Sequence, residues 1–182
     1  FKVVTWTAMK SQALAADEIK QVTVDTTVQT KAIAFPTDAR LAHKARRALV
    51  RVAKAEGIKL RQTYERASKA ALFLHSRYAT ARHFKRATRQ TRKLQVFLGR
   101  VIRDIRRKQA QPAAHLANLL DIAQRIHTQR RHDSSKCYSV HAPEVACIAK
   151  GKVNQKYEFG CKVAVTTTTQ TNWIVGIQAH PG

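Results

Sequence analysis

The chain has 182 residues, with 34 lysines and arginines against 11 aspartates and glutamates, so its formal net charge at pH 7 is +23. Hydrophobic residues make up 44% of the sequence, which is enough for a buried core and excludes a disordered basic tail. No apolar run approaches the roughly 18–20 residues of a membrane span, so no membrane partner is expected. The three widely spaced cysteines, Cys137, Cys147 and Cys161, form no disulfide framework and predict reduced thiols.

The positive charge is concentrated in the middle of the chain. Residues 40–132 contain 25 basic and four acidic residues, a net charge of +21, whereas the rest of the chain contains nine and seven, a net charge of +2. Because self-repulsion of this size needs compensation, a polyanion is the natural partner, and nucleic acid is the commonest one. The alternative is a set of merely solvated helix faces.

The first predicted strand follows a stretch of helical composition at residues 11–20. It is the sequence VTVDTTVQ at residues 22–29. Its alternation places the three valines on one face and Asp25 on the other, together with Thr23, Thr27 and Gln29. Asp25 is therefore either an ordinary surface residue or the first ligand of a metal site.

Helical spacing begins after Pro36, which stops regular strand pairing. Apolar residues at helical intervals predict a helix over residues 41–56, which Thr37 or Asp38 can cap and Gly57 closes. The same spacing continues from residue 60 to residue 105 and resembles a coiled-coil seam with a stutter. It predicts one very long helix, or two helices end to end with a break near residues 76–80.

A further helix is predicted at about residues 113–130, after the turn sequence QAQPAAH. Short connections favour antiparallel packing, so the basic middle is expected to form a helical hairpin or small bundle. Three candidate strands follow, within residues 137–151, 156–169 and 172–182, and they are expected to form an antiparallel meander. His132 and His141 lie near Cys137, but their spacing matches no standard zinc pattern.

One sheet with an inserted helical block is the simplest architecture for this order of elements. It predicts an α/β fold with three parts. Residues 1–36 hold the lead-in and the first strand, residues 37–132 the basic helical insertion, and residues 133–182 the further strands of the same sheet.

Basic residues recur at steps of three or four along the second half of the long helical pattern, opposite its apolar seam. Such a stripe matches a row of DNA phosphates, which position a duplex without reading its sequence. Four interleaved aromatics, Tyr64, Tyr78, Phe84 and Phe97, have seam spacing and are interpreted as core residues rather than base-stacking platforms. Asp104 is interpreted as a local ion-pair partner. The stripe consists of Arg82, Lys85, Arg86, Arg89, Arg92, Lys93, Arg100, Arg103, Arg106 and Arg107.

Several strings of the sequence, in order along nearly the whole chain, resemble a known family. They are VDTTVQTKAIAFPTDARL, LGRVIRDIRRK, YSVHAPEV, KGKVNQKYEFGCKVAV and GIQAHPG. They are similar to insertion-sequence transposases of the DDE class, in the branch with a helical insertion after the first catalytic aspartate. The resemblance implies an RNase H-like fold, here a partial sheet, in which the first of three acidic metal ligands falls on Asp25.

The resemblance also implies the chemistry and the partners. Two Mg²⁺ or Mn²⁺ ions, held about 3.5–4 Å apart by carboxylates, would support DNA strand cleavage and transfer. The implied partners are transposon ends and target DNA, with possible self-association, and the implied location is a bacterial-type cytoplasm near the nucleoid. Asp25, with the hydroxyls of Thr26 and Thr27, would leave most of a Mg²⁺ coordination shell to water.

The chain departs from the family pattern in its completeness. It begins with Phe1 rather than Met, and the family's second Asp and its Glu belong to segments that would follow Gly182. Glu158 matches a family position, but its segment is not that of the second Asp. The expectation is therefore a truncated segment that binds DNA without transposing it. Two alternatives remain: a non-enzymatic basic helical nucleic-acid-binding or scaffold protein, and a decayed element that competes with the full enzyme.

Overall fold

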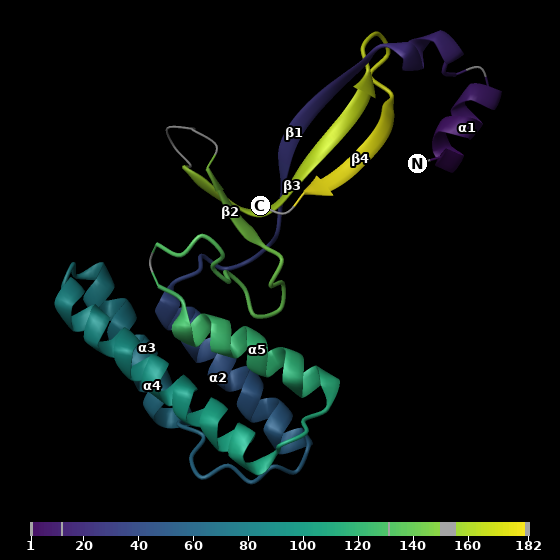
Figure 1. The fold of residues 1–182 in the computed structure, drawn as a ribbon. Helices are drawn as coiled ribbons and strands as arrows, with labels where there is room; N and C mark the ends of the chain where they lie inside the picture. Colours follow the sequence, from purple (N-terminus) through teal and green to yellow (C-terminus); the bar gives the residue numbers. More distant parts are fainter. Residues whose placement is uncertain (1, 12, 131, 150–155, 181–182) are drawn as a thin grey trace. The chain divides into compact units, whose positions relative to one another are not determined.

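The computed structural model describes residues 2–11, 13–130, 132–149 and 156–180. The chain divides into two compact units (Figure 1). The helical unit consists of residues 33–143, and the sheet unit of residues 1–32 and 144–182. The helical unit extends beyond the predicted 37–132, because the loop after the last helix buries Cys137 and Val140 in the helical core.

Four helices build the helical unit, in agreement with the predicted bundle. They are α2 (Asp38–Ala55), α3 (Glu65–Thr80), α4 (Phe84–Lys108) and α5 (Ala114–Thr128). The start of α2 is capped as predicted, since the Thr37 hydroxyl accepts the Arg40 N–H at 3.3 Å. Gly57 follows α2 with φ +72°, a left-handed conformation that glycine adopts without steric cost. The core is made of leucine, isoleucine, valine and alanine side chains from all four helices.

The long helical pattern of residues 60–105 forms two helices, as one of the two predictions had it, but the helices fold back on each other instead of lying end to end. Residues 81–83 separate α3 from α4, and Arg82 has φ +58° in that turn. The two helices lie side by side as a hairpin (Figure 1). Tyr64, at the start of α3, stacks on Phe97 of α4 with ring centroids 4.8 Å apart. The seam therefore pairs the two halves of the pattern with each other, and a second chain is not required to bury it.

The prediction that Phe84 is a core residue is wrong. It is the first residue of α4, directly after the turn, and its side chain is 66% exposed. Phe84 lies at the end of the hairpin, and seam spacing alone does not bury its ring there. Tyr64, Phe97 and Tyr78 are partly buried, and the first two pack against the helical core.

The sheet unit contains α1 (Lys2–Lys10), a 3₁₀ turn (Ala16–Lys20), β1 (Val22–Thr30), β2 (Ala146–Ala149), β3 (Tyr157–Thr168) and β4 (Ile174–His180). The helical composition of residues 11–20 thus yields a single 3₁₀ turn, and of residues 137–149 only the last four form a strand. The described strands make one four-stranded antiparallel sheet, in which β3 pairs with β1, β2 and β4. The prediction that the first strand joins the later strands is confirmed.

The sheet buries few side chains. No residue of β1 is buried, and Val24 is 61% exposed. The chain is thus a mixed α/β protein with a well-packed helical unit and an open sheet. Among the described residues, no helix combines the length and the apolar character that a membrane crossing requires.

Candidate nucleic-acid interface

The basic stripe lies on the exposed face of α4 and in the turn before it. Leu94, Leu98, Val101 and Ile105 recur at steps of three or four and bury one face of the helix in the bundle. The same periodicity turns the opposite face to solvent. All ten predicted basic residues are exposed, from Arg82 to Arg107. The structure therefore brings the stripe together on one surface.

The first half of the stripe consists of cations that no described acid neutralises. No ion pair or side-chain hydrogen bond joins another described residue to the side chains of Arg82, Lys85, Arg89, Arg92 and Lys93. Long cationic side chains on a helix surface keep their rotamer freedom under such conditions. In the same half, the guanidinium of Arg86 lies 5.8 Å from the centre of the Tyr78 ring. This half of the stripe offers charge without fixed geometry.

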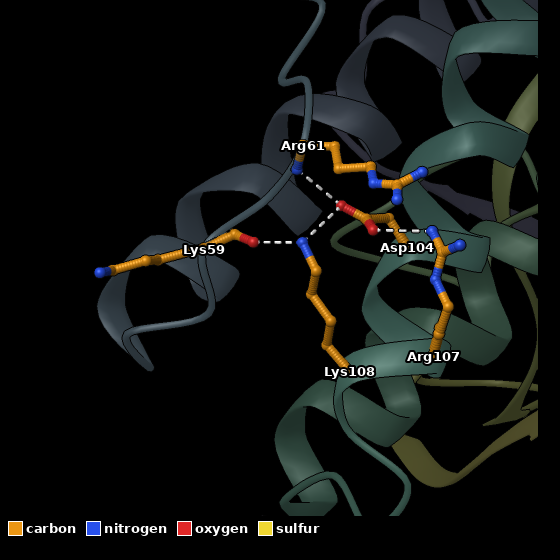
Figure 2. A network of polar contacts seen from close by, with 5 residues as sticks. All are labelled: Lys59, Arg61, Asp104, Arg107 and Lys108. Carbon is orange, nitrogen blue, oxygen red and sulfur yellow. Dashed lines mark hydrogen bonds and ion pairs between the residues drawn. The ribbon is translucent and has the colours of Figure 1, made fainter.

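In the second half of the stripe, Arg107 belongs to a polar network around Asp104 (Figure 2). The Asp104 carboxylate accepts the Arg61 backbone N–H at 2.8 Å, the Lys108 ammonium at 3.1 Å and the Arg107 guanidinium at 3.0 Å. Lys108 also donates to the carbonyl oxygen of Lys59. The prediction that Asp104 is a local ion-pair partner is confirmed, and the network also attaches the 57–64 loop to α4.

The electrostatics of Asp104 follow from this network. Its side chain is buried, and burial by itself raises the pKa of a carboxyl group. The Arg61 N–H, Lys108 and Arg107 outweigh the burial, so the pKa of Asp104 lies below its ordinary value of 3.8. The carboxylate is therefore ionised at neutral pH, and its charge is compensated within the protein.

A groove opens beside this network. It has a volume of about 530 Å³ and lies between α4 and the 57–64 loop. Arg100 is held at its wall, 5.8 Å from the centre of the Tyr64 ring, and its guanidinium donates to the Tyr64 hydroxyl at 3.4 Å. Tyr64 is itself fixed by the stack on Phe97. The lining residues are Arg61, Gln62, Tyr64, Arg100, Arg103, Asp104 and Arg107.

Sequence reasoning missed Arg61 and a second basic surface. Arg61 lies in a loop, and no periodicity links it to residues 43 positions further on. The second surface is a groove of about 310 Å³ beside α2, lined by Lys44, Arg47 and Arg51 together with Val140 and His141. Its signal was present in the sequence, because these three basic residues are spaced three and four apart, opposite the apolar stripe of α2.

Asp25 lies on β1, and its side chain is exposed. The register pairs it with Val165 of β3, so its face of the sheet continues across β3 through Val163 and Val165. Thr23 and Thr27 share this face with Asp25, whereas Thr26 lies on the opposite one. The Asp25 carboxylate forms no ion pair or side-chain hydrogen bond with another described residue.

Glu158 lies on the opposite face of the sheet from Asp25. The register from Asp25 through Val165 to Glu158 spans seven residues of β3, and an odd step along a strand reverses the face. At about 3.3 Å per residue the two positions are also about 23 Å apart along the strand. Glu158 is buried, and Ile148 of β2 is its partner in the register. The sheet does not bring these two acids together.

The described residues do not fit a two-metal centre. Such a centre needs several carboxylates that converge on the ions, and Asp25 is the sole carboxylate that the described strands place on its face. In the part of the chain that the structure describes, no group of three or more His, Cys, Asp or Glu side chains could hold a metal ion.

Comparison with known proteins leaves the family open. No family model matches the chain, and no solved structure matches it. A stretch of 77 residues is 51% identical to a protein of Rhizobium meliloti described as an uncharacterized protein, ORF8 in the nfe locus. The match covers 42% of this chain and 37% of that protein, so the chain spans little more than a third of the relative's length.

Proposed function

We propose that this chain is the front segment of a DDE-type DNA transposase and that its helical unit binds duplex DNA through the phosphate backbone. The DNA-binding part is supported chiefly by the exposed basic face of α4 and of the turn before it, on which all ten cations are accessible. The one acid of that helix, Asp104, is buried and neutralised by ion pairs. The face therefore presents positive charge to a polyanion without an internal competitor.

The transposase part of the proposal is supported by the resemblance of the ordered strings and by the sheet. A transposase of the DDE class would need its first aspartate on a strand that pairs with strands following the insertion. Here β1 carries Asp25 and pairs with β3 across the helical insertion of the chain. RNase H-like topology, cleavage and strand transfer belong to this proposal.

The DNA-binding part is tested by the salt dependence of duplex affinity. If about six of the stripe's cations each neutralise one phosphate, log K should fall with log[salt] at a slope near −5, at about −0.9 per phosphate. Fluorescence anisotropy of a labelled duplex, measured over a salt series with the full chain, gives this slope directly. A slope near zero would remove backbone binding from the proposal.

Catalysis is proposed to require carboxylates beyond Asp25, so that this chain alone does not cut or join DNA. A nicking and strand-transfer assay with Mg²⁺ or Mn²⁺ tests this, and no turnover is expected. Turnover that disappears in the Asp25→Asn variant would show that the chain is catalytically sufficient and would refute this part.

A second candidate function is that of a non-enzymatic scaffold for nucleic acid. The observation in its favour is the exposed basic stripe of residues 82–107, which could hold a polyanion without any catalytic site. The two functions predict different results when a second polypeptide is added that carries the second Asp and the Glu of the DDE pattern. Restored metal-dependent nicking that depends on Asp25 supports the transposase segment, and its absence supports the scaffold.

A further inference from the structure

We propose that the groove between α4 and the 57–64 loop is an organised binding subsite for phosphodiester groups of DNA, with Asp104 as its positioning residue. This inference rests on the proposed function, because it names where on the basic surface the backbone is held most tightly. The basic stripe then has two parts that bind DNA in different ways. Residues 82–93 attract DNA by charge alone, and residues 100–108 bind phosphates in a defined geometry.

The charge of the groove favours an anion. Four of its lining residues are arginines, Arg61, Arg100, Arg103 and Arg107, against a single acid, Asp104. Both oxygens of that carboxylate already accept hydrogen bonds from the protein: Oδ1 from Arg107, and Oδ2 from the Arg61 N–H and Lys108. Arginine forks suit phosphate oxygens geometrically, since they donate two parallel hydrogen bonds.

The size of the groove is also suitable. Its volume of about 530 Å³ falls within the range of roughly 300–1,000 Å³ of pockets that take small ligands. One or two phosphodiester groups with their sugars can enter a groove of this size from an open side. A flat basic surface would offer no such enclosure, and this feature separates residues 100–108 from the rest of the stripe.

Two structural devices hold the groove in shape. The first is the wall formed by Arg100, Tyr64 and Phe97, in which a guanidinium lies over one ring that stacks on the other. Tyr64 has φ +53°, a left-handed conformation that is uncommon for a large side chain and that persists only where the surroundings impose it. The second device is Asp104.

Asp104 joins the two sides of the groove. It accepts the Arg61 N–H from the loop and two cationic side chains from the last turns of α4. Figure 2 shows the guanidinium groups of Arg61 and Arg107 on one side of this network, whereas the Lys59 side chain points away from it. Without the carboxylate the loop loses the hydrogen bond from the Arg61 N–H to α4, and the contact that fixes Arg61 relative to Arg107 is lost.

The role of Asp104 can be separated from its charge. The Asp104→Asn substitution raises the net charge of the chain by one, so general electrostatic attraction predicts tighter DNA binding. Positioning predicts the opposite. We expect the affinity for duplex DNA at fixed ionic strength to fall by about tenfold, because charge-assisted hydrogen bonds that hold the groove are lost.

The test uses the full chain, a labelled duplex of random sequence and two matched triple variants. One carries Arg100→Gln, Arg103→Gln and Arg107→Gln in the groove, and the other carries Arg82→Gln, Arg89→Gln and Arg92→Gln outside it. Both remove three positive charges from the same surface. We expect the groove variant to lose at least about tenfold more affinity at one ionic strength. Circular dichroism checks that each variant is folded.

Each outcome decides the proposal. Equal losses in the two triple variants, or tighter binding by Asp104→Asn, would overturn the subsite and leave the proposed DNA binding intact. No loss in either triple variant would overturn the proposed DNA binding as well. If Asp104→Asn fails to fold, the comparison of the triple variants decides by itself.

Discussion

The helical unit and the sheet unit differ in both charge and packing. Residues 33–143 contain 26 basic and six acidic residues, a net charge of +20, whereas the sheet unit contains eight and five, a net charge of +3. The helical unit buries Leu49, Leu98, Ile105 and Leu116 completely, whereas β1 of the sheet unit buries no residue. The unit that repels itself most strongly is therefore the one with the larger apolar core.

The difference between the units explains how a strongly basic chain can still form a buried core. An amphipathic helix such as α4 separates cations from core residues around its axis, so the same periodicity that builds the core also builds the basic surface. The sheet has no comparable burial, and its polar face carries the one acid on which the transposase proposal depends. Four predictions test whether the two units differ in packing, stability and DNA binding.

The largest expected effect is the loss of core packing in the helical unit. Leu98→Ala removes a completely buried side chain and should lower the free energy of unfolding by about 2–5 kcal/mol, through lost burial and a residual cavity. Val24→Thr on exposed β1 should change it by no more than about 0.5 kcal/mol. Urea unfolding followed by circular dichroism measures both. Equal effects would show that the sheet is as well packed as the bundle.

Gly160 and Gly99 are both too close to a neighbour to accept a Cβ, but the neighbour is a backbone atom in one case and a side chain in the other. A Cβ at Gly160 would lie 2.1 Å from the carbonyl oxygen of Gln29 in β1, and one at Gly99 would lie 2.8 Å from the His127 ring. A backbone carbonyl within a sheet cannot turn away as a side chain can. Gly160→Ala should therefore cost about 3 kcal/mol and Gly99→Ala about 1 kcal/mol.

Hydrogen exchange locates the two glycine effects. Gly160→Ala should raise the exchange rates of β1 amides, since β1 pairs with β3 at this position. Gly99→Ala should leave those amides unchanged and affect only α4 and α5. Unchanged β1 exchange in Gly160→Ala would contradict the register.

Acid should weaken the helical unit in two steps. Burial, followed by nearby arginines, lowers the pKa values of His43, His75 and His127 below the ordinary 6.5. As the pH falls, these histidines are protonated in the unfolded chain before they are protonated in the folded one. The free energy of unfolding should therefore decrease as the pH drops below about 6.5. The pKa of Asp104 is also lowered, so its contribution is present above about 3.8 and is lost as the pH falls through the lower folded value.

Urea unfolding at a series of pH values measures these steps. Asp104→Asn should abolish the lower step and retain the upper one. Substitution of the three histidines by glutamine should flatten the upper step. A helical unit whose stability rose between pH 7 and pH 5 would contradict the predicted sign.

The smallest expected effect concerns Asp25. If duplex binding belongs to the helical unit, Asp25→Asn should change the affinity by no more than about twofold, since it alters one charge of a strongly basic chain. Fluorescence anisotropy on the same labelled duplex measures it. A tenfold change would mean that the sheet unit contacts DNA directly.

Features of this protein that depend on local periodicity could be predicted from its sequence. The strand containing Asp25, the cap at Thr37, the end of α2 before Gly57 and the amphipathic character of α4 could all be read from neighbouring residues, since helix and strand repeats are short. The order of strand, helical block and strands also indicated that one sheet is interrupted by an insertion. The exposure of the ten cations followed from the apolar seam opposite them.

Features that depend on residues far apart in the sequence could be seen only in the folded chain. The seam of residues 60–105 is equally compatible with a long helix and with a hairpin, and packing between α3 and α4 selects the hairpin. The groove joins Arg61 to Asp104, which lie 43 positions apart and share no periodicity. The register of β3 separates Asp25 from Glu158. Local sequence patterns show which face of a helix or strand is apolar, but only contacts between elements show which other element that face packs against.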